Sequence, residues 1–220
     1  YASQIEILYG LELGVQPHLG RLLADFYEKY GKSTADALVE SVLRNVEIAK
    51  EENFHDLVIS VKSSDVREVY EAYKKLSKLV DYPLHIGVTE AGTAYRGIIK
   101  SAMALGGLLL EGIGDTMRIS LTADPVEEIK AAKEMLRSLG ILKEGVEIIS
   151  CPTCGRTEID LIGLAHDVEK AFEHDKRNIK IAVMGCVVNG PGEAREADYG
   201  VAGGRGVGIL FKKGKVVKKV

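Results

Sequence analysis

The stretch that decides the fold is "HDLVISVKSSDVREVYEAYKKLSKLV", residues 55–80. Its first half is a run of apolar, largely β-branched residues that ends in polar side chains, as a buried strand does. Its second half spaces apolar residues three and four positions apart, which is the period of an amphipathic helix. The stretch therefore predicts one βα unit, a strand followed directly by a helix.

Two more units of the same kind follow. Strands are predicted within "PLHIGVTEAG" (83–92) and "DTMRISLTAD" (115–124), and a buried helix within 98–114. A further helix is predicted over 125–140, with a proline in its first turn and a glycine as its stop. Repeated βα units imply a parallel sheet with helices on its faces, so an α/β fold is expected.

The βα units fit a TIM-type (β/α) barrel, of which only a part is present. Such a barrel takes about 250 residues, whereas the first cysteine is already Cys151. The sequence also begins at Tyr1 rather than at methionine, and both ends look cut. We expect residues 1–144 to be the C-terminal part of a barrel. Its open edge would leave strand backbone groups unpaired and make the chain prone to aggregate.

Polar residues stand where each of the three predicted strands ends. Lys62 follows the first, Glu90 the second, and Arg118 and Ser120 the third. In a (β/α) barrel the carboxyl ends of the strands meet on the face that holds the active site. Polar residues also mark where any buried strand meets solvent, but three successive strands ending in a Lys, a Glu and an Arg-Ser pair favour one shared site.

After Gly145 the pattern changes to a small α+β module, residues 145–220. "VEIISCPTCGR" (146–156) is a predicted strand that runs into a loop, and residues 157–174 have helical spacing. "NIKIAVMGCVVNGPGEA" (178–194) is again a strand followed by a loop. The last stretch predicts a hairpin that turns at Lys213 and Gly214.

The three cysteines, Cys151, Cys154 and Cys186, all stand where an apolar run gives way to a loop. Zinc and iron–sulfur clusters commonly take four protein ligands, so a fourth ligand is needed. Glu193 is the nearest candidate, because the Asn-Gly-Pro-Gly sequence before it can turn its carboxylate back. Zinc binding, thioredoxin-like redox chemistry and buried structural cysteines are the alternatives that this spacing leaves open.

Composition limits the class of protein. The formal net charge is −3 and the pI is near 6.0, so nothing in the charge balance suggests nucleic-acid binding. The apolar runs are interrupted too early to span a bilayer, and no signal-peptide pattern opens the sequence. We expect a soluble protein inside the cell.

Two long motifs carry a family resemblance. "CPTCGRTEIDLIG" (151–163) together with "GCVVNGPGEA" (185–194) closely resembles the cluster motif of the hydroxymethylbutenyl diphosphate synthase family, iron–sulfur enzymes of the methylerythritol phosphate route to isoprenoids. The strand ends "VISVKSSD" (58–65), "PLHIGVTEAG" and "EGIGDTMRISLTADPVEEI" (111–129) resemble it as well. The resemblance runs from about Glu28 to Phe211, and the stretch 1–27 has no assigned role.

The resemblance implies a [4Fe-4S] cluster held by Cys151, Cys154, Cys186 and Glu193. It implies reductive ring opening of 2-C-methyl-D-erythritol 2,4-cyclodiphosphate to 4-hydroxy-3-methylbut-2-enyl diphosphate, with ferredoxin or flavodoxin as electron donor. It further implies a homodimer of the full-length protein, with the cluster module of one subunit capping the barrel of the other. The compartment would be the bacterial cytoplasm or a plastid.

With this resemblance, the strand-end residues take expected roles. Glu90 would donate a proton, which requires partial burial to raise its pKa. Lys62 and Arg118 would meet the diphosphate, unless they form structural ion pairs, while Ser120 would bond a phosphate oxygen and Asn189 would touch substrate from the cluster side.

One departure from the family lowers the expected activity. "GVQPHLGRL" (14–22) lacks the Asn and Ser of the family's segment. We therefore expect the chain alone to hold a cluster but to turn over poorly. The competing hypothesis is a zinc-stabilised binding module on a barrel remnant, without redox activity. A different barrel enzyme with merely structural cysteines is a third.

Overall fold

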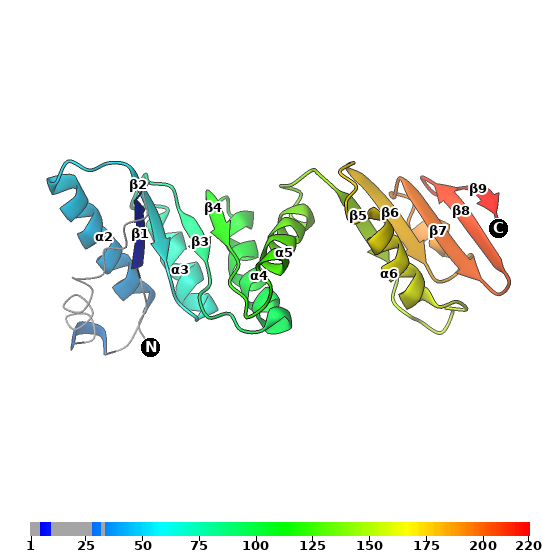
Figure 1. Cartoon of the computed structure of the whole chain (residues 1–220), viewed down its shortest axis with the longest axis horizontal. Coiled ribbons are helices and arrows are strands. Elements are labelled where there is room, and N and C mark those ends of the chain that lie inside the picture. Colours follow the sequence, from blue (N-terminus) through cyan, green and yellow to red (C-terminus); the bar gives the residue numbers. More distant parts are fainter. Residues whose placement is uncertain (1–4, 10–27, 32–33) are drawn as a thin grey trace. The chain divides into compact units, whose positions relative to one another are not determined.

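The computed structural model describes residues 5–9, 28–31 and 34–220, and within 5–9 the backbone alone. The chain divides into two compact units, Tyr1–Leu139 (unit 1) and Gly140–Val220 (unit 2), which are drawn in Figure 1 and are described separately below. The departure at 14–22 lies outside the described residues.

Unit 1 alternates strands and helices. In chain order its elements are β1 (Ile5–Tyr9), α2 (Ala35–Glu51), β2 (Leu57–Val61), α3 (Val66–Leu76), β3 (His85–Gly87), α4 (Ala94–Leu110), β4 (Thr116–Arg118) and α5 (Pro125–Ser138). β3 pairs in parallel with β4, and a parallel bridge between Ile59 and Leu84 joins β2 to β3. The predicted parallel βα arrangement is therefore confirmed.

The first strand was not predicted and runs the other way. β1 pairs with β2 in antiparallel register, with Ile5 opposite Val61 and Tyr9 opposite Leu57. It occupies the edge of β2 where a barrel would place another parallel strand. Helix α2 was not predicted either, although Thr34 supplies an N-cap whose hydroxyl accepts from the Ala37 backbone N–H.

Local signals set the ends of the predicted helices. Asp65 caps α3 by accepting from two backbone N–H groups, and Asp124 caps α5 directly before Pro125. Gly140 has a φ of +69° just past α5, as predicted for a helix stop. Helix α4 begins earlier than the predicted 98–114, directly after its N-cap residue Thr93. It also ends earlier, because the glycines at 112 and 114 take left-handed φ angles of 74° and 117°.

Tyr73 anchors the core of unit 1. It comes from the buried stripe of α3 and is among the largest side chains with no exposed surface. Its hydroxyl accepts from the Val61 backbone N–H at 2.8 Å and donates to the His85 carbonyl at 2.5 Å. One side chain of α3 thus satisfies backbone groups on both β2 and β3, which stabilises the sheet from its covered face.

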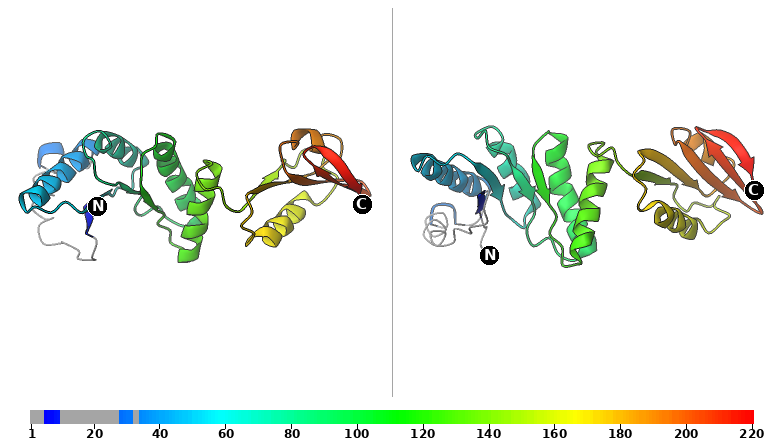
Figure 2. Two further views of the ribbon diagram at one scale, coloured as in Figure 1. Left: turned by 90° about the horizontal axis from the view of Figure 1, so that it is seen from above. Right: turned by 45° about the horizontal axis from the view of Figure 1, so that its top comes forward.

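Unit 2 is a five-stranded sheet in the order β5-β6-β7-β8-β9. Its elements are β5 (Val146–Ser150), α6 (Leu161–Phe172), β6 (Ile179–Met184), the short helix α7 (Gly190–Glu193), β7 (Tyr199–Gly204), β8 (Val207–Lys212) and β9 (Lys215–Lys219). The first three strands are parallel and the last two antiparallel additions. Helix α6 covers one face of this sheet (Figure 2).

Two details of unit 2 compare with the sequence predictions. The hairpin of β8 and β9 turns at Lys213 and Gly214, whose φ angles of 47° and 72° fit a two-residue turn, so that prediction is confirmed. Helix α6 begins at Leu161 rather than at 157, because the side chain of Asp160 accepts from the Gly163 backbone N–H and caps it there.

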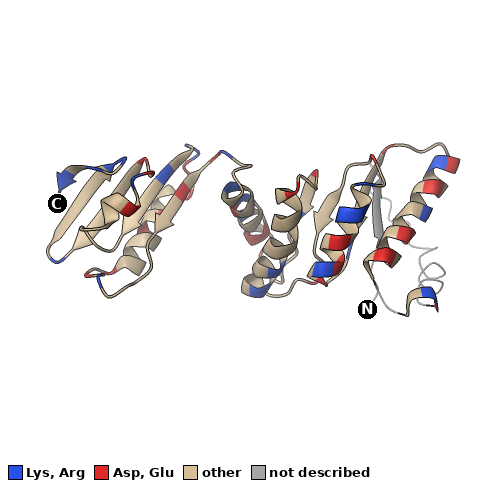
Figure 3. Ribbon diagram, turned by 180° about the vertical axis from the view of Figure 1, so that it is seen from behind, with Lys and Arg blue, Asp and Glu red and all other residues tan. Residues whose placement is uncertain are grey.

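Charge and hydropathy add two observations. Acidic and basic residues intermingle on the outer helices of unit 1 (Figure 3). Among the described ranges, no helix combines the length and the hydropathy needed to cross a membrane.

Candidate functional site

The predicted strand-end residues of unit 1 lie at one edge of its sheet. Lys62 follows β2 directly and is 6% exposed, and Arg118 closes β4 opposite Gly87. Ser120, two residues on, is half-buried. Because β2, β3 and β4 run in parallel, their carboxyl ends share an edge.

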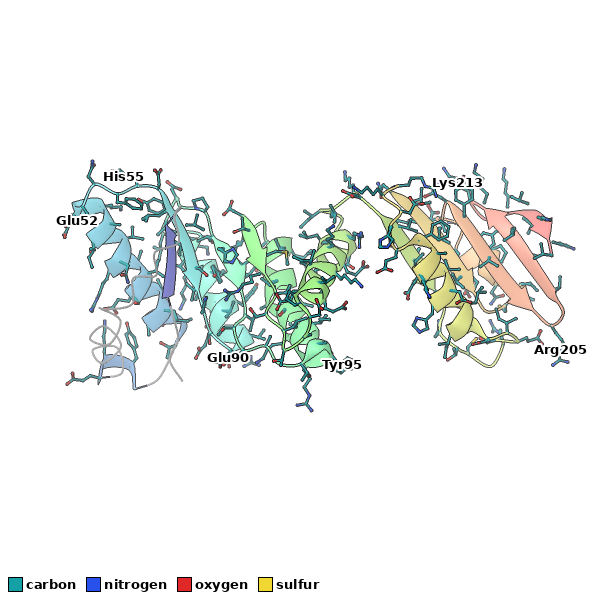
Figure 4. All side chains as sticks on the ribbon, in the orientation of Figure 1. Glu52, His55, Glu90, Tyr95, Arg205 and Lys213 are labelled. Atoms are coloured by element: carbon teal, nitrogen blue, oxygen red, sulfur yellow. The ribbon has the colours of Figure 1, made fainter. Side chains whose placement is uncertain are left out.

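Figure 4 shows that residues before β2 and residues after β3 lie at opposite ends of unit 1. It places Glu90 and Tyr95 at one end of unit 1, and Glu52 and His55, which precede β2, at the other.

Backbone bonds tie the loops of this edge together. The Thr89 N–H donates to the Ser63 carbonyl at 3.2 Å, and the Thr122 N–H donates to the Gly92 carbonyl at 2.9 Å. The Ser63 hydroxyl in turn donates to Glu68 on α3 at 2.7 Å. Hydrogen bonds between backbone groups therefore connect the loops after β2, β3 and β4.

Glu90 departs from the expectation of partial burial. It lies in the loop after β3 with a left-handed φ of 50°, and its side chain is exposed. The expected environment of Glu90 is wrong, while its role as proton donor stays a prediction.

Tyr73 is a residue of this region that sequence reasoning missed. Burial raises the pKa of Tyr73 to about 12, and its hydroxyl bonds to Val61, the residue before Lys62. The tyrosine therefore fixes the backbone from which Lys62 projects. Its place in the apolar stripe of α3 could have predicted that the ring of Tyr73 is buried in the core. The sequence pattern holds no information about the partners of its hydroxyl.

The cysteines of unit 2 lie at the carboxyl edge of its parallel strands. Cys151 follows β5 and Cys186 comes shortly after β6, and Ser150 pairs with Val183 in the parallel register. The Gly185 backbone N–H donates to Cys151 Sγ at 3.2 Å. Cys151 and Cys186 are half-buried and Cys154 is exposed, and all three are free thiols.

Glu193 is placed differently from the prediction. Residues Gly190–Glu193 form the short helix α7 rather than a tight reversing turn, and Glu193 is exposed. Gly190 serves close packing instead, because a Cβ on it would lie 2.8 Å from that of Met184 and 3.0 Å from that of Ala202. Asn189 is the residue before this helix, and its carbonyl accepts from the Glu193 N–H.

The cysteine loop is fastened to the end of β7. The Arg205 backbone N–H donates to Glu158 at 2.9 Å, and a Cβ on Gly203 would lie 2.4 Å from Ile159. Figure 4 places Arg205 and Lys213 at opposite ends of the sheet. The loop after β5 and the turn after β7 thus share the edge marked by Arg205.

The residues fit an iron–sulfur cluster in donor type and in local hydrogen bonding. Thiolates are the usual ligands of such clusters, and backbone N–H groups directed at sulfur stabilise the negative charge of a bound cluster. The Gly185 N–H is directed at Cys151 Sγ in this way. Among residues 28–31 and 34–220, three or more His, Cys, Asp or Glu side chains nowhere gather as a metal site. In the described conformation the candidate ligands therefore lie at one edge of the sheet of unit 2 but do not converge on a single metal-binding point.

Together the two units define a class: a (β/α)-barrel segment followed by an α+β module that presents cysteines on its strand ends. Residues 9–133 match the model of the GcpE TIM-barrel domain, and residues 147–220 match that of the GcpE protein C-terminal domain. The chain belongs to the GcpE family. The match begins before Glu28 and ends after Phe211, so the expected limits of the resemblance were too narrow.

Curated relatives agree with the family. The chain is 63% identical over 201 residues to a protein of Fusobacterium nucleatum, 60% over 211 residues to one of Clostridium tetani, and 54% over 211 residues to one of Bacillus subtilis. Each is named 4-hydroxy-3-methylbut-2-en-1-yl diphosphate synthase (flavodoxin). These alignments cover 91 to 96% of this chain but only 56 to 60% of each relative.

Proposed function

We propose that this chain carries part of the substrate site and the cluster module of a hydroxymethylbutenyl diphosphate synthase. The reaction would be reductive dehydroxylation and ring opening of 2-C-methyl-D-erythritol 2,4-cyclodiphosphate, with water as the second product. The observation that carries the proposal is family membership across both units, at up to 63% identity to relatives with that name.

The substrate half of the proposal rests on the carboxyl edge of unit 1. Lys62 and Arg118 would neutralise the cyclic diphosphate, Lys62 as a point charge and Arg118 as a planar fork. Ser120 would donate to a phosphate oxygen. Lys62 is buried, so its charge would act in a medium of lower dielectric than water.

Glu90 would supply the proton that leaves with the hydroxyl as water. It is exposed in this chain, so the proposal requires substrate or another part of the full-length protein to cover it during the reaction. The backbone of Glu90 has a left-handed φ of 50°, which is uncommon outside glycine and is often retained at functional positions.

The redox half rests on the edge of unit 2. Cys151, Cys154, Cys186 and Glu193 would hold a [4Fe-4S] cluster, with Asn189 beside it. When bound, such a cluster supplies two electrons one at a time and a Lewis-acidic iron for the departing oxygen. Flavodoxin, which is part of the relatives' names, is the proposed electron donor. The zinc-module alternative finds no support in the family match.

A chimera tests the proposal on a chain of full length. Residues 34–220 would replace the matching segment of the Fusobacterium nucleatum relative, and turnover of the cyclic diphosphate would be followed with reduced flavodoxin. We expect product formation, because this segment supplies all of the proposed ligands and substrate contacts.

Two variants of the chimera locate the activity. Cys186→Ser should abolish turnover by removing a cluster ligand, and Glu90→Gln should lower kcat far more than KM by removing the proton donor. Turnover that survives Cys186→Ser would contradict the proposed cluster site.

A further inference from the structure

A buried hydroxyl beside the cysteine edge has no partner. Thr157 Oγ1 is inaccessible to solvent and makes no hydrogen bond to any residue that the structure describes. Leaving a buried hydroxyl unsatisfied costs about 1–3 kcal/mol, so native chains rarely retain one without a use. Thr157 lies in the loop that joins Cys154 to α6.

A second, independent observation places this hydroxyl close to the cluster ligands. A Cβ built on Gly185 would lie 2.8 Å from Thr157 Oγ1 and 3.1 Å from Leu161. The same Gly185 donates its backbone N–H to Cys151 Sγ. Thr157 therefore packs on the residue that stands between β6 and Cys186 and that already bonds one cysteine sulfur.

We propose that Thr157 is a positioning residue whose hydroxyl donates a hydrogen bond to sulfur of the bound cluster, beside the N–H of Gly185. The inference rests on the proposed cluster and deepens it. A threonine hydroxyl rotates freely about its Cβ–Oγ1 bond, so it can take such an acceptor when one is present. Hydrogen bonds to sulfur favour the more reduced, more negative state and raise the reduction potential.

This role predicts opposite effects on the two forms of the protein. In the cluster-free chain Thr157→Val replaces an unsatisfied hydroxyl with a methyl group of similar size, so thermal stability should hold or rise. In the cluster-loaded chain the same substitution removes a donor, so the midpoint potential should become more negative and the cluster should be lost faster in air. A hydroxyl with a merely structural role would move neither property in these directions.

The test measures the melting temperature of the cluster-free chain and, after anaerobic loading with iron and sulfide, the midpoint potential of the cluster. Thr157→Ser should rescue the potential because it keeps the hydroxyl. Thr122→Val, at an exposed threonine of unit 1, is the control and should leave both readouts at wild-type values.

Three results would overturn the inference. A Thr157→Val chain that melts lower without the cluster would mean that the hydroxyl has a partner in the protein. A loaded Thr157→Val chain with the wild-type potential would remove the hydroxyl from the cluster's surroundings, while leaving the proposed function intact. A wild-type chain that takes up no iron and sulfide would overturn the inference together with the proposed function.

Discussion

The two units present their candidate groups in different ways. In unit 1 the candidate side chains stand on or just beyond strand ends, over a core that includes the fully buried Tyr73 and Ile59. In unit 2 the candidate ligands stand on loops and a short helix, over a small core of alanines around Phe211. The difference teaches that unit 1 positions its candidate side chains by the strands that carry them. Unit 2 positions its candidate ligands by close contacts between loops, made possible by glycines.

The largest effect is expected from emptying the core of unit 2. Phe211 is 1% exposed and its ring lies against Gly200. Phe211→Ala should destabilise unit 2 by about 3–5 kcal/mol, because a large buried ring leaves a cavity. Hydrogen exchange read separately in the two units would measure it.

Leu210→Ala is the control for that substitution, because Leu210 is exposed and should lose little. We expect the amides of unit 1 to keep their protection when Phe211 is truncated. Equal loss of protection in both units would contradict the picture of two cores.

A smaller effect is expected from the tyrosine anchor of unit 1. Tyr73→Phe removes the hydroxyl that serves Val61 and His85, and should cost about 1–3 kcal/mol in urea unfolding. Tyr95→Phe is the matched control, since Tyr95 is 78% exposed and should change nothing measurable. Equal stability of the two variants would mean that the buried hydroxyl does not stabilise the sheet.

The same tyrosine predicts a dependence on alkaline pH. Burial raises the pKa of Tyr73 from 10.0 to about 12, so between these values the unfolded chain releases a proton that the folded chain retains. Stability is therefore complete below pH 10 and falls as pH rises, by about 1.4 kcal/mol per unit within that window. Urea unfolding across the window should show the slope in the wild type and a weaker slope in Tyr73→Phe. Equal slopes would contradict the assignment.

The smallest effect is expected at the surface between α3 and α4. Glu111 accepts from the Tyr70 hydroxyl and from Lys74 Nζ at 2.9 Å, and these bonds lower the pKa of Glu111. Glu111→Gln should lower stability only slightly, since the pair is exposed. The loss should be present above the ordinary carboxyl pKa and vanish as pH falls through the lowered one. A loss as large as that of Tyr73→Phe would contradict the ranking.

The sequence predicted what local chemistry controls. Pro125, Gly140 and the Lys213-Gly214 turn each act through their own backbone, so their roles were visible without the structure. Strand β7 was missed because Gly200 and its other glycines weaken a strand pattern, and what selects them is the close approach of Phe211 and Ile159.

In the candidate site, too, locally determined features could be predicted and features set by distant contacts could not. The position of the cysteines, Lys62 and Arg118 at or just beyond strand ends could be predicted, because apolar runs that stop at polar residues mark such ends. The exposure of Glu90, the short helix at Glu193 and the orphaned hydroxyl of Thr157 depend on neighbours distant in sequence, which no local pattern encodes.

The most direct test of the central claim is anaerobic reconstitution of this chain with iron and sulfide, followed by the visible spectrum and analysis of iron, sulfide and zinc per chain. The cluster account predicts a brown protein with about four irons and four sulfides, and their loss in Cys186→Ser. A colourless protein with one tightly held zinc and no sulfide would contradict it.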